Sequence, residues 1–155
     1  MTNGPINYRQ FDVTDIAYQQ SLKIRESILR QPLGLTLSHK DVEGDAQQIH
    51  IGAFEQANLI GCIIVASLDN EPASFRIRQM AVKASHRQQG IGRNLVLMAE
   101  QCIQHHHGTR IVLDARKTAI GFYQSLNYQC TSSEFIANTI AHVVMEKKLI
   151  NNLCS

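Results

Sequence analysis

A glycine-containing turn is the segment of this sequence whose residue types and spacing could do chemistry. Residues 87–93 read RQQGIGR, and they lie between the end of a predicted strand and the start of a predicted long helix. The first amides of a helix have no partner within the helix and lie at the positive end of its dipole, so they favour a phosphate group. Glycine lets that group approach the main chain, and Arg87 and Arg93 add positive charge. We therefore predict a phosphate-binding turn, with a plain strand-to-helix turn as the alternative.

The spacing within residues 87–93 does not fit two common nucleotide-binding motifs. A G-x-x-x-x-G-K-[ST] loop would need a lysine and a hydroxyl group for magnesium, and a dinucleotide turn would need G-x-G-x-x-G. The segment has neither pattern. These differences argue against a simple nucleoside triphosphatase and against a dehydrogenase.

The turn resembles a motif of a known enzyme family. Residues 87–92 are similar to the [QR]-x-x-G-x-[GA] motif with which GNAT acetyltransferases hold the pyrophosphate of acyl-CoA. Residues 80–82 (MAV) resemble the end of the family's central strand, and residues 119–128 (AIGFYQSLNY) resemble its A-x-x-F-Y-x-x-L-G-[FY] segment. Asn127 stands where the family has glycine, and we expect this change to affect only a helix cap. The resemblance covers about residues 74–130 and implies a GNAT-like acyl-CoA N-acyltransferase fold.

The resemblance implies acetyl-CoA as a co-substrate. Its pyrophosphate would lie on main-chain amides of the turn, and its pantetheine would pair with the main chain of residues 80–82 like an added strand. The cofactor-binding residues expected on this basis are Met80, Ala81, Val82, Arg87, Gln88, Gln89, Gly90, Ile91, Gly92, Arg93 and Phe122. Because most of these contacts come from the main chain, bulk at Gly90 or Gly92 should weaken binding more than loss of the Arg93 side chain.

The reaction implied is transfer of an acetyl group from acetyl-CoA to a primary amine of a small molecule or peptide by direct attack. A main-chain N–H near Val82 would stabilise the oxyanion. Tyr123 would donate a proton to the leaving sulfur, since a phenol with a pKa of about 10 is protonated at neutral pH. From spacing alone, Tyr123 would instead be a core aromatic on a helix stripe. The alternative function is a non-catalytic acyl-CoA-binding sensor or interaction module.

Direct attack also needs a base, because an amine of pKa near 10 is mostly protonated at pH 7. His142 is the first candidate, since residues 140–142 (IAH) resemble an apolar-Pro-His segment found late in some members of the family. A hydrogen-bonded structural histidine is the equal alternative. Glu134 and Glu43 are weaker candidates, and each is expected to be a solvated loop charge.

Other charged and histidine residues are given structural interpretations. The run His105-His106-His107 falls at a helix end, where consecutive side chains splay by about 100° and cannot all bind one ion, so we expect no metal site. His50 and His86 are expected to be ordinary strand and turn residues. Arg25 interrupts the apolar face of a predicted helix, so it would contact an acidic substrate group or pair with a nearby carboxylate.

The elements that must position these residues follow from hydrophobic periodicity. Runs rich in strand-forming residues and bounded by polar or turn residues predict strands, and apolar positions that recur every three or four residues predict helices. Residues 33–44 mix turn formers with leucines and are expected to form an irregular or short helical segment over an open site. Strands are expected at residues 6–13, 48–54, 59–68, 74–82, 110–115, 128–131 and 141–149, and helices at 15–30, 91–108 and 119–127, with a polar loop at 132–139. This order predicts an α/β (α+β mixed sheet) fold whose central, mostly antiparallel sheet is flanked by helices.

Composition limits the domain organisation and the partners. With 155 residues, 44% of them apolar, the chain is expected to form a single N-acetyltransferase domain over residues 1–155. The net charge is only +2 and no Lys/Arg block stands out, so we expect no nucleic-acid and no membrane partner. The four cysteines form no C-x-x-C pair and no signal peptide is seen, which favours a cytoplasmic location. A homodimer through the last strand is possible.

Overall fold

The computed structural model describes residues 4–150, and these residues fall into two compact units. Within the described chain, the first unit comprises residues 4–65 and 79–100, and the second comprises residues 66–78 and 101–150. Strands β3 (Asn58–Ser67) and β4 (Ser74–Val82) and helix α3 (Ile91–His105) contribute residues to both units. Each unit is described by itself.

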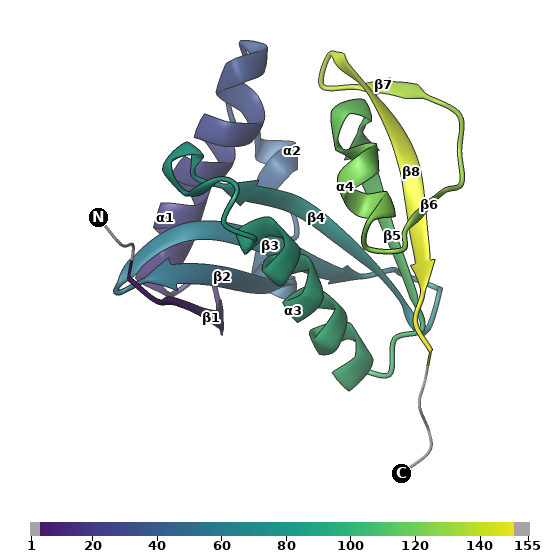
Figure 1. Cartoon of the computed structure of the whole chain (residues 1–155), viewed down its shortest axis with the longest axis horizontal. Helices are drawn as coiled ribbons and strands as arrows, with labels where there is room; N and C mark the ends of the chain where they lie inside the picture. Colours follow the sequence, from purple (N-terminus) through teal and green to yellow (C-terminus); the bar gives the residue numbers. More distant parts are fainter. Residues whose placement is uncertain (1–3, 151–155) are drawn as a thin grey trace. The chain divides into compact units, whose positions relative to one another are not determined.

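The first unit contains the N-terminal strands of the sheet, which pair antiparallel. Strand β1 (Ile6–Phe11) pairs with β2 (Ile49–Glu55), and β2 pairs with β3. β4 follows β3 in the strand order (Figure 1). The β2–β3 hairpin confirms the prediction from residues 48–68. Its connection is short because Gln56 adopts a left-handed conformation with φ 55°.

A helical segment connects β1 to β2. Helix α1 (Ile16–Arg25) begins after Asp15, whose carboxylate accepts a hydrogen bond from the Ala17 amide at 2.9 Å. The helix continues as a π-helical turn, Glu26–Arg30, and a 3₁₀ turn, Gln31–Leu33, as the prediction of a helix over residues 15–30 indicated. The predicted irregular segment then contains only one short helix, α2 (His39–Val42).

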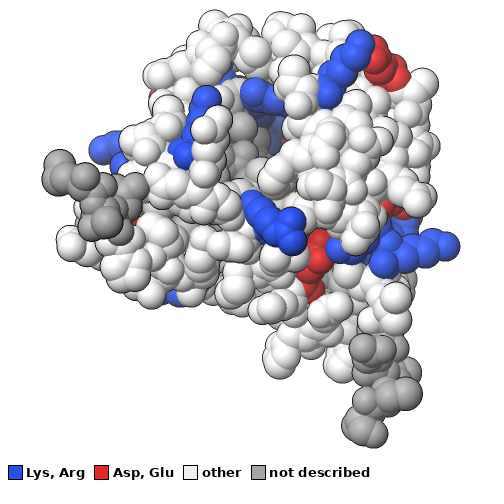
Figure 2. Space-filling model, in the orientation of Figure 1, with Lys and Arg blue, Asp and Glu red and all other residues white. Residues whose placement is uncertain are grey.

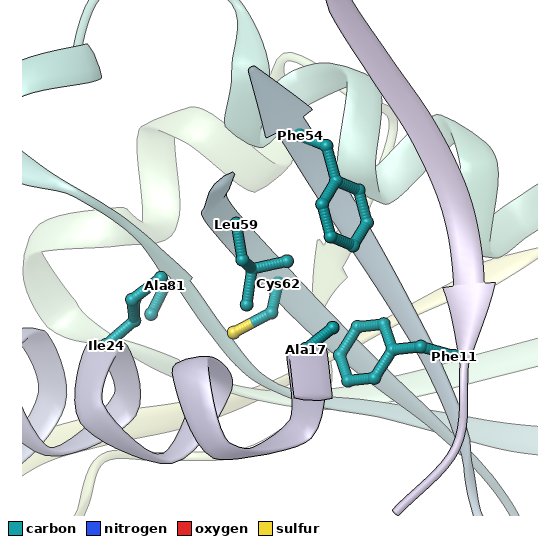
Figure 3. Packing of buried hydrophobic residues seen from close by; sticks show 7 residues of the cluster. All are labelled: Phe11, Ala17, Ile24, Phe54, Leu59, Cys62 and Ala81. Carbon is teal, nitrogen blue, oxygen red and sulfur yellow. The ribbon is translucent and has the colours of Figure 1, made fainter. Parts of the chain in front are cut away.

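An apolar cluster joins α1 to the strands of the first unit (Figure 3). Removal of each large side chain of this kind from water stabilises the fold by roughly 1.5 to 3 kcal/mol. Because the cluster includes the strand that leads into the glycine turn, packing fixes the start of that turn. The buried members are Phe11, Ala17, Ile24, Phe54, Leu59, Cys62 and Ala81.

The second unit contains the remaining strands. The first residues of β4 pair in parallel with β5 (Arg110–Arg116), and β5 pairs antiparallel with β8 (Ile140–Lys148) along its length. Strand β6 (Gln129–Cys130) also pairs antiparallel with β8. The sheet is therefore mixed and mostly antiparallel, which confirms the predicted fold class.

One helix of the second unit carries the predicted aromatic segment. Helix α4 (Ile120–Gln124) follows a 3₁₀ turn, Lys117–Ala119. Asn127 then adopts a left-handed conformation with φ 72°, which is how asparagine commonly closes a helix. Asn127 thus adopts the left-handed conformation that glycine also adopts readily.

The prediction of a polar loop over residues 132–139 was wrong in part. This segment contains a short strand, β7 (Phe135–Ala137), which pairs antiparallel with β8. The turn between them, Asn138-Thr139, has positive φ at both residues, as the favoured two-residue hairpin turns do. Phe135 and Ile136 favour a strand, but a run of three residues is too short to be recognised without its partner β8.

Two surface properties bear on possible partners. No helix among residues 4–150 is long and apolar enough to span a bilayer. On the face shown in Figure 2, Lys and Arg side chains lie in separate groups over a largely uncharged surface.

Candidate functional site

The predicted phosphate-binding turn connects β4 to α3 in the first unit. After Val82 the chain forms a 3₁₀ turn, Ala84–His86, and then an exposed turn up to Gly90. Gln88 and Gly90 adopt left-handed conformations with φ 62° and 76°. The carbonyl of Gly90 accepts the hydrogen bond of the Asn94 amide at 3.0 Å and so starts the helix.

The turn presents a set of free main-chain donors. Within residues 4–150, the amides of residues 88–93 make no main-chain hydrogen bond. A Cβ built on Gly90 would meet nothing within 4 Å, so the space beside these donors is open. The side chains of Arg87 and Arg93 are exposed next to the amides. This arrangement has the donors, dipole and charge that a pyrophosphate requires.

Buried contacts hold the start of α3 in place. Ile91 and Leu95 are 2% and 0% exposed, and they lie against Gly61 of β3. A Cβ on Gly61 would come within 3.2 Å of Leu95 Cδ1 and 3.3 Å of Ile91 Cγ2. Glycine at this position therefore allows the helix to approach the strand closely. Sequence reasoning missed this role, although a glycine inside the apolar run of residues 59–68 is a usable signal.

The strand before the turn has an unusual conformation at Gln79. This residue has φ 54° inside β4, and the ladder between β4 and β5 ends before it, at the pair Arg76↔Val112. Met80, Ala81 and Val82 follow the irregularity without a partner in β5. Their main chain is the part of β4 that, by the resemblance to GNAT acetyltransferases, would pair with pantetheine. No pattern in the sequence predicted a left-handed glutamine within a strand.

Arg25 does not contact solvent, so one of its predicted roles is excluded. Its side chain is 0% exposed and pairs with Asp45 at 2.7 Å between Nη1 and Oδ2. A buried guanidinium that already donates to protein acceptors cannot bind an acidic substrate group from solution. The alternative, a pair with a nearby carboxylate, is confirmed.

Tyr123 lies in the second unit, on α4, with its ring held by other aromatic rings. The centroids of Phe122 and Tyr128 are 4.9 Å and 5.7 Å from the Tyr123 centroid, both edge-on. Burial raises the pKa of Tyr123 to about 12. The phenol therefore remains protonated at every physiological pH. The core-aromatic interpretation and the proton-donor interpretation are both compatible with these contacts.

His142 lies in the second unit as well, on β8. The residue is 7% exposed, and its ring stacks on Phe135 of β7 with centroids 5.8 Å apart. The Nδ1 atom lies 2.9 Å from the carbonyl oxygen of Ile140. A carbonyl only accepts, so Nδ1 carries the hydrogen, and Nε2 of the neutral ring carries a lone pair. Sequence reasoning missed Phe135, because residues 132–139 had been interpreted as a loop.

The remaining candidates have structural partners or stay exposed. Glu134 is exposed and pairs with Lys117 at 2.9 Å, as expected of a loop charge. His86 pairs with Glu55 at 3.3 Å and belongs to the turn. His50 is buried and contacts the carbonyl of Asp45 at 2.8 Å. Residues 4–150 hold no cluster of His, Cys, Asp or Glu suited to a metal ion. Cys154 lies outside these described residues.

The structure thus brings the predicted residues together in two groups. The predicted cofactor-binding residues of β4, the turn and the start of α3 lie together in the first unit. Phe122, Tyr123 and His142 lie in the second unit, and the described residues show no hydrogen bond or ring contact between Tyr123 and His142.

Comparison with known proteins matches most of this chain to one family. Residues 35–149 match the family model described as Acetyltransferase (GNAT) domain. The uncharacterized protein YyaT of Bacillus subtilis is 24% identical over 143 residues, which cover 90% of this chain and 95% of YyaT.

Solved structures share the fold of this chain. ElaA of Escherichia coli superimposes with a TM-score of 0.80 at 17% identity, covering 92% of this chain and 99% of ElaA. The PaiA N-acetyltransferase of Thermoplasma acidophilum, solved in complex with coenzyme A, has a TM-score of 0.72 at 15% identity, covering 94% of this chain and 99% of that protein.

Proposed function

The chain belongs to the GNAT acetyltransferase family, and from this membership we propose that it transfers an acetyl group from acetyl-CoA to a primary amine of a small molecule or peptide. The observation that carries the proposal is the set of free amides at residues 88–93, beside the open space at Gly90. Main-chain donors at the positive end of a fifteen-residue helix suit the pyrophosphate of coenzyme A. The crystallised complex of PaiA with coenzyme A supports this choice of ligand.

Acetyl-CoA would supply a thioester whose carbonyl carbon is open to attack by a neutral amine. The turn of residues 87–93 would hold the diphosphate, and the main chain of residues 80–82 would hold the pantetheine. This division of roles places most of the cofactor affinity in the main chain. The side chains of Arg87 and Arg93 would add an attraction that salt weakens, because both are exposed.

Tyr123 would donate a proton to the departing CoA thiolate. Its pKa of about 12 keeps the hydroxyl protonated, and the rings of Phe122 and Tyr128 fix its orientation. A module that only binds acyl-CoA has no need of a proton donor, so this residue favours the enzyme over the sensor. His142, with Nε2 free to accept a proton, would serve as the base for the amine.

The proposal is tested by turnover with a panel of amines. Purified protein is incubated with acetyl-CoA and with polyamines, amino acid amides, aminoglycosides or peptides, and free CoA thiol is measured. We expect amine-dependent release of thiol with at least one class of amine, together with a product heavier by one acetyl group. Binding of CoA without turnover on any amine would instead favour the sensor.

A further inference from the structure

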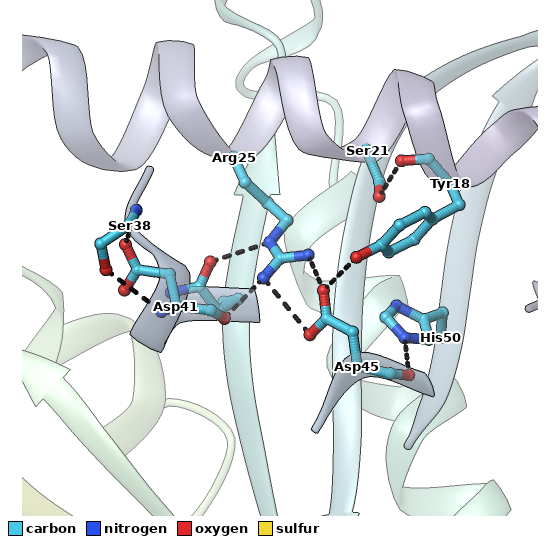
Figure 4. Close-up of polar contacts among 8 residues, drawn as sticks. Tyr18, Ser21, Arg25, Ser38, Asp41, Asp45 and His50 are labelled. Carbon is cyan, nitrogen blue, oxygen red and sulfur yellow. Dashed lines mark hydrogen bonds and ion pairs between the residues drawn. The ribbon is translucent and has the colours of Figure 1, made fainter. Parts of the chain in front are cut away.

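A buried guanidinium connects the segment after α1 to the strand that precedes the glycine turn. Arg25 is the last residue of α1 and is 0% exposed. Figure 4 shows its guanidinium between Asp41 and Asp45, which belong to the segment between α1 and β2. All of these residues lie in the first unit.

The donors of Arg25 point to different parts of that unit. Nη1 donates to the Asp45 carboxylate at 2.7 Å, and Nη2 donates to the Asp41 carbonyl at 2.9 Å. Nε donates to Oε1 of Gln79 at 2.9 Å. The Arg25 side chain therefore donates hydrogen bonds both to the segment of residues 38–45 and to Gln79, the left-handed residue of β4.

The segment of residues 38–45 also has polar contacts with residues of α1 and the turn after it other than Arg25. Tyr18 donates to the Asp45 carboxylate at 2.7 Å. Asp41 accepts two hydrogen bonds from Arg30, at 2.7 Å and 3.0 Å. A network in which each charge has partners is rigid, so a displacement at one end is transmitted rather than absorbed.

Gln79 is the member of this network that belongs to β4, directly before the residues expected to hold pantetheine. Its φ of 54° is costly for a residue other than glycine, and such conformations persist only where surrounding contacts enforce them. The bond from Arg25 Nε is a contact of this kind. The next residues, Met80, Ala81 and Val82, are those whose main chain would hold pantetheine.

We propose that Arg25 is a positioning residue that couples the segment of residues 38–45 to the cofactor-binding strand through Gln79. The inference rests on the proposed function, since it takes CoA as the ligand of residues 80–93. Occupation of that strand by CoA restrains Gln79 and, through Arg25, further restrains the segment of residues 38–45. Most of this segment belongs to residues 33–44, which we expect from the sequence to lie over the open site, so the cofactor prepares the acceptor side before the amine binds.

The test is amide hydrogen exchange measured with and without free CoA. In the wild type, CoA slows exchange in residues 88–93 and also slows exchange in residues 38–45, by about 5-fold or more. Gln79→Gly permits the left-handed conformation but removes the acceptor, so CoA still protects residues 88–93 while the effect on residues 38–45 falls to less than about 2-fold. Gln79→Glu keeps the acceptor oxygen and retains the wild-type coupling.

The outcomes separate this inference from the proposed function. Protection of residues 88–93 without any effect on residues 38–45 in the wild type would overturn the inference and leave CoA binding intact. Full coupling in Gln79→Gly would also overturn it, because the side-chain bond would then be unnecessary. If CoA protects neither segment in the wild type, the proposed function fails as well. Should Gln79→Gly not fold, Gln79→Asn, whose amide is one methylene shorter, takes its place.

Discussion

The ring of Tyr123 meets the ring of Tyr128 edge-on, with centroids 5.7 Å apart. This contact, with the one to Phe122, holds the phenol by its carbon atoms and leaves the hydroxyl oxygen without a hydrogen-bond partner among residues 4–150. A hydroxyl that is positioned but unbonded contributes little to stability, so its removal can be read as an effect on chemistry.

Tyr123→Phe is therefore expected to be folded and slow. The free energy of unfolding in urea should stay within about 0.5 kcal/mol of the wild-type value, and kcat should fall by at least about 100-fold, the usual minimum for loss of a general acid. Thiol release with the best amine of the panel measures kcat. Activity within about 3-fold of the wild type would remove Tyr123 from the mechanism and leave it a core aromatic.

The pH dependence of the wild type provides a second check on the same residue. Tyr123 can act as an acid only while it is protonated. Because burial raises its pKa to about 12, we expect activity to be lost near pH 12 rather than near 10, the ordinary pKa of tyrosine. We expect kcat/KM to rise with deprotonation of the amine and to show no decline between about pH 9 and pH 10.5. A decline centred near pH 10 that is absent from Tyr123→Phe would contradict the buried environment.

The buried pair of Arg25 and Asp45 is expected to dominate the response to charge removal. Asp45→Asn leaves a fully buried guanidinium without its counter-charge, which costs about 3 to 5 kcal/mol of unfolding free energy. Glu134→Gln is the matched control, since its pair with Lys117 is exposed and should be worth less than about 0.5 kcal/mol. Urea unfolding of both variants measures the difference. Equal effects would contradict the burial of Arg25.

The lowered pKa of Asp41 predicts that the free energy of unfolding decreases in acid. The hydrogen bonds from Arg30 lower the pKa of Asp41 to about 2, below its ordinary value of 3.8. A lowered carboxyl pKa contributes stability that is present above pH 3.8 and is lost as pH falls through 2, here about 2 kcal/mol. Asp41→Asn should therefore be less stable than the wild type at pH 6, with the gap narrowing towards pH 2. A gap that is independent of pH would contradict the pairing.

The sequence predicted the parts of the fold that local patterns determine. Two runs of strand-forming residues separated by a polar segment identified the β2–β3 hairpin, and the spacing of apolar residues identified α3 and α4. The strand β7 was missed because residues 135–137 form it only by pairing with β8. The partner of Arg25 could not be chosen, because Asp45 lies far along the chain and only folding brings them together.

The candidate site divides in the same way. The turn of residues 87–93 could be predicted because its chemistry depends on glycines and a helix start that are adjacent in sequence. The left-handed Gln79 could not, since glutamine rarely adopts that conformation and the bond that enforces it comes from α1. Sequence reasoning also missed the role of Gly61. Because Gly61 has no side chain, Ile91 and Leu95 of α3 can pack closely against β3.

The most direct test of the central claim is calorimetric titration of free CoA into the wild type, Gly90→Trp and Gly34→Trp. Gly34 and Gly90 have similar φ, 72° and 76°, and neither has an atom within 4 Å of a built Cβ, so both tryptophans meet the same local strain. We predict that CoA binds the wild type and Gly34→Trp alike and that Gly90→Trp weakens binding by at least about 100-fold, because its side chain fills the phosphate position. Absence of binding to the wild type, or equal binding to all three proteins, would contradict the assignment of residues 87–93 as the CoA-binding turn.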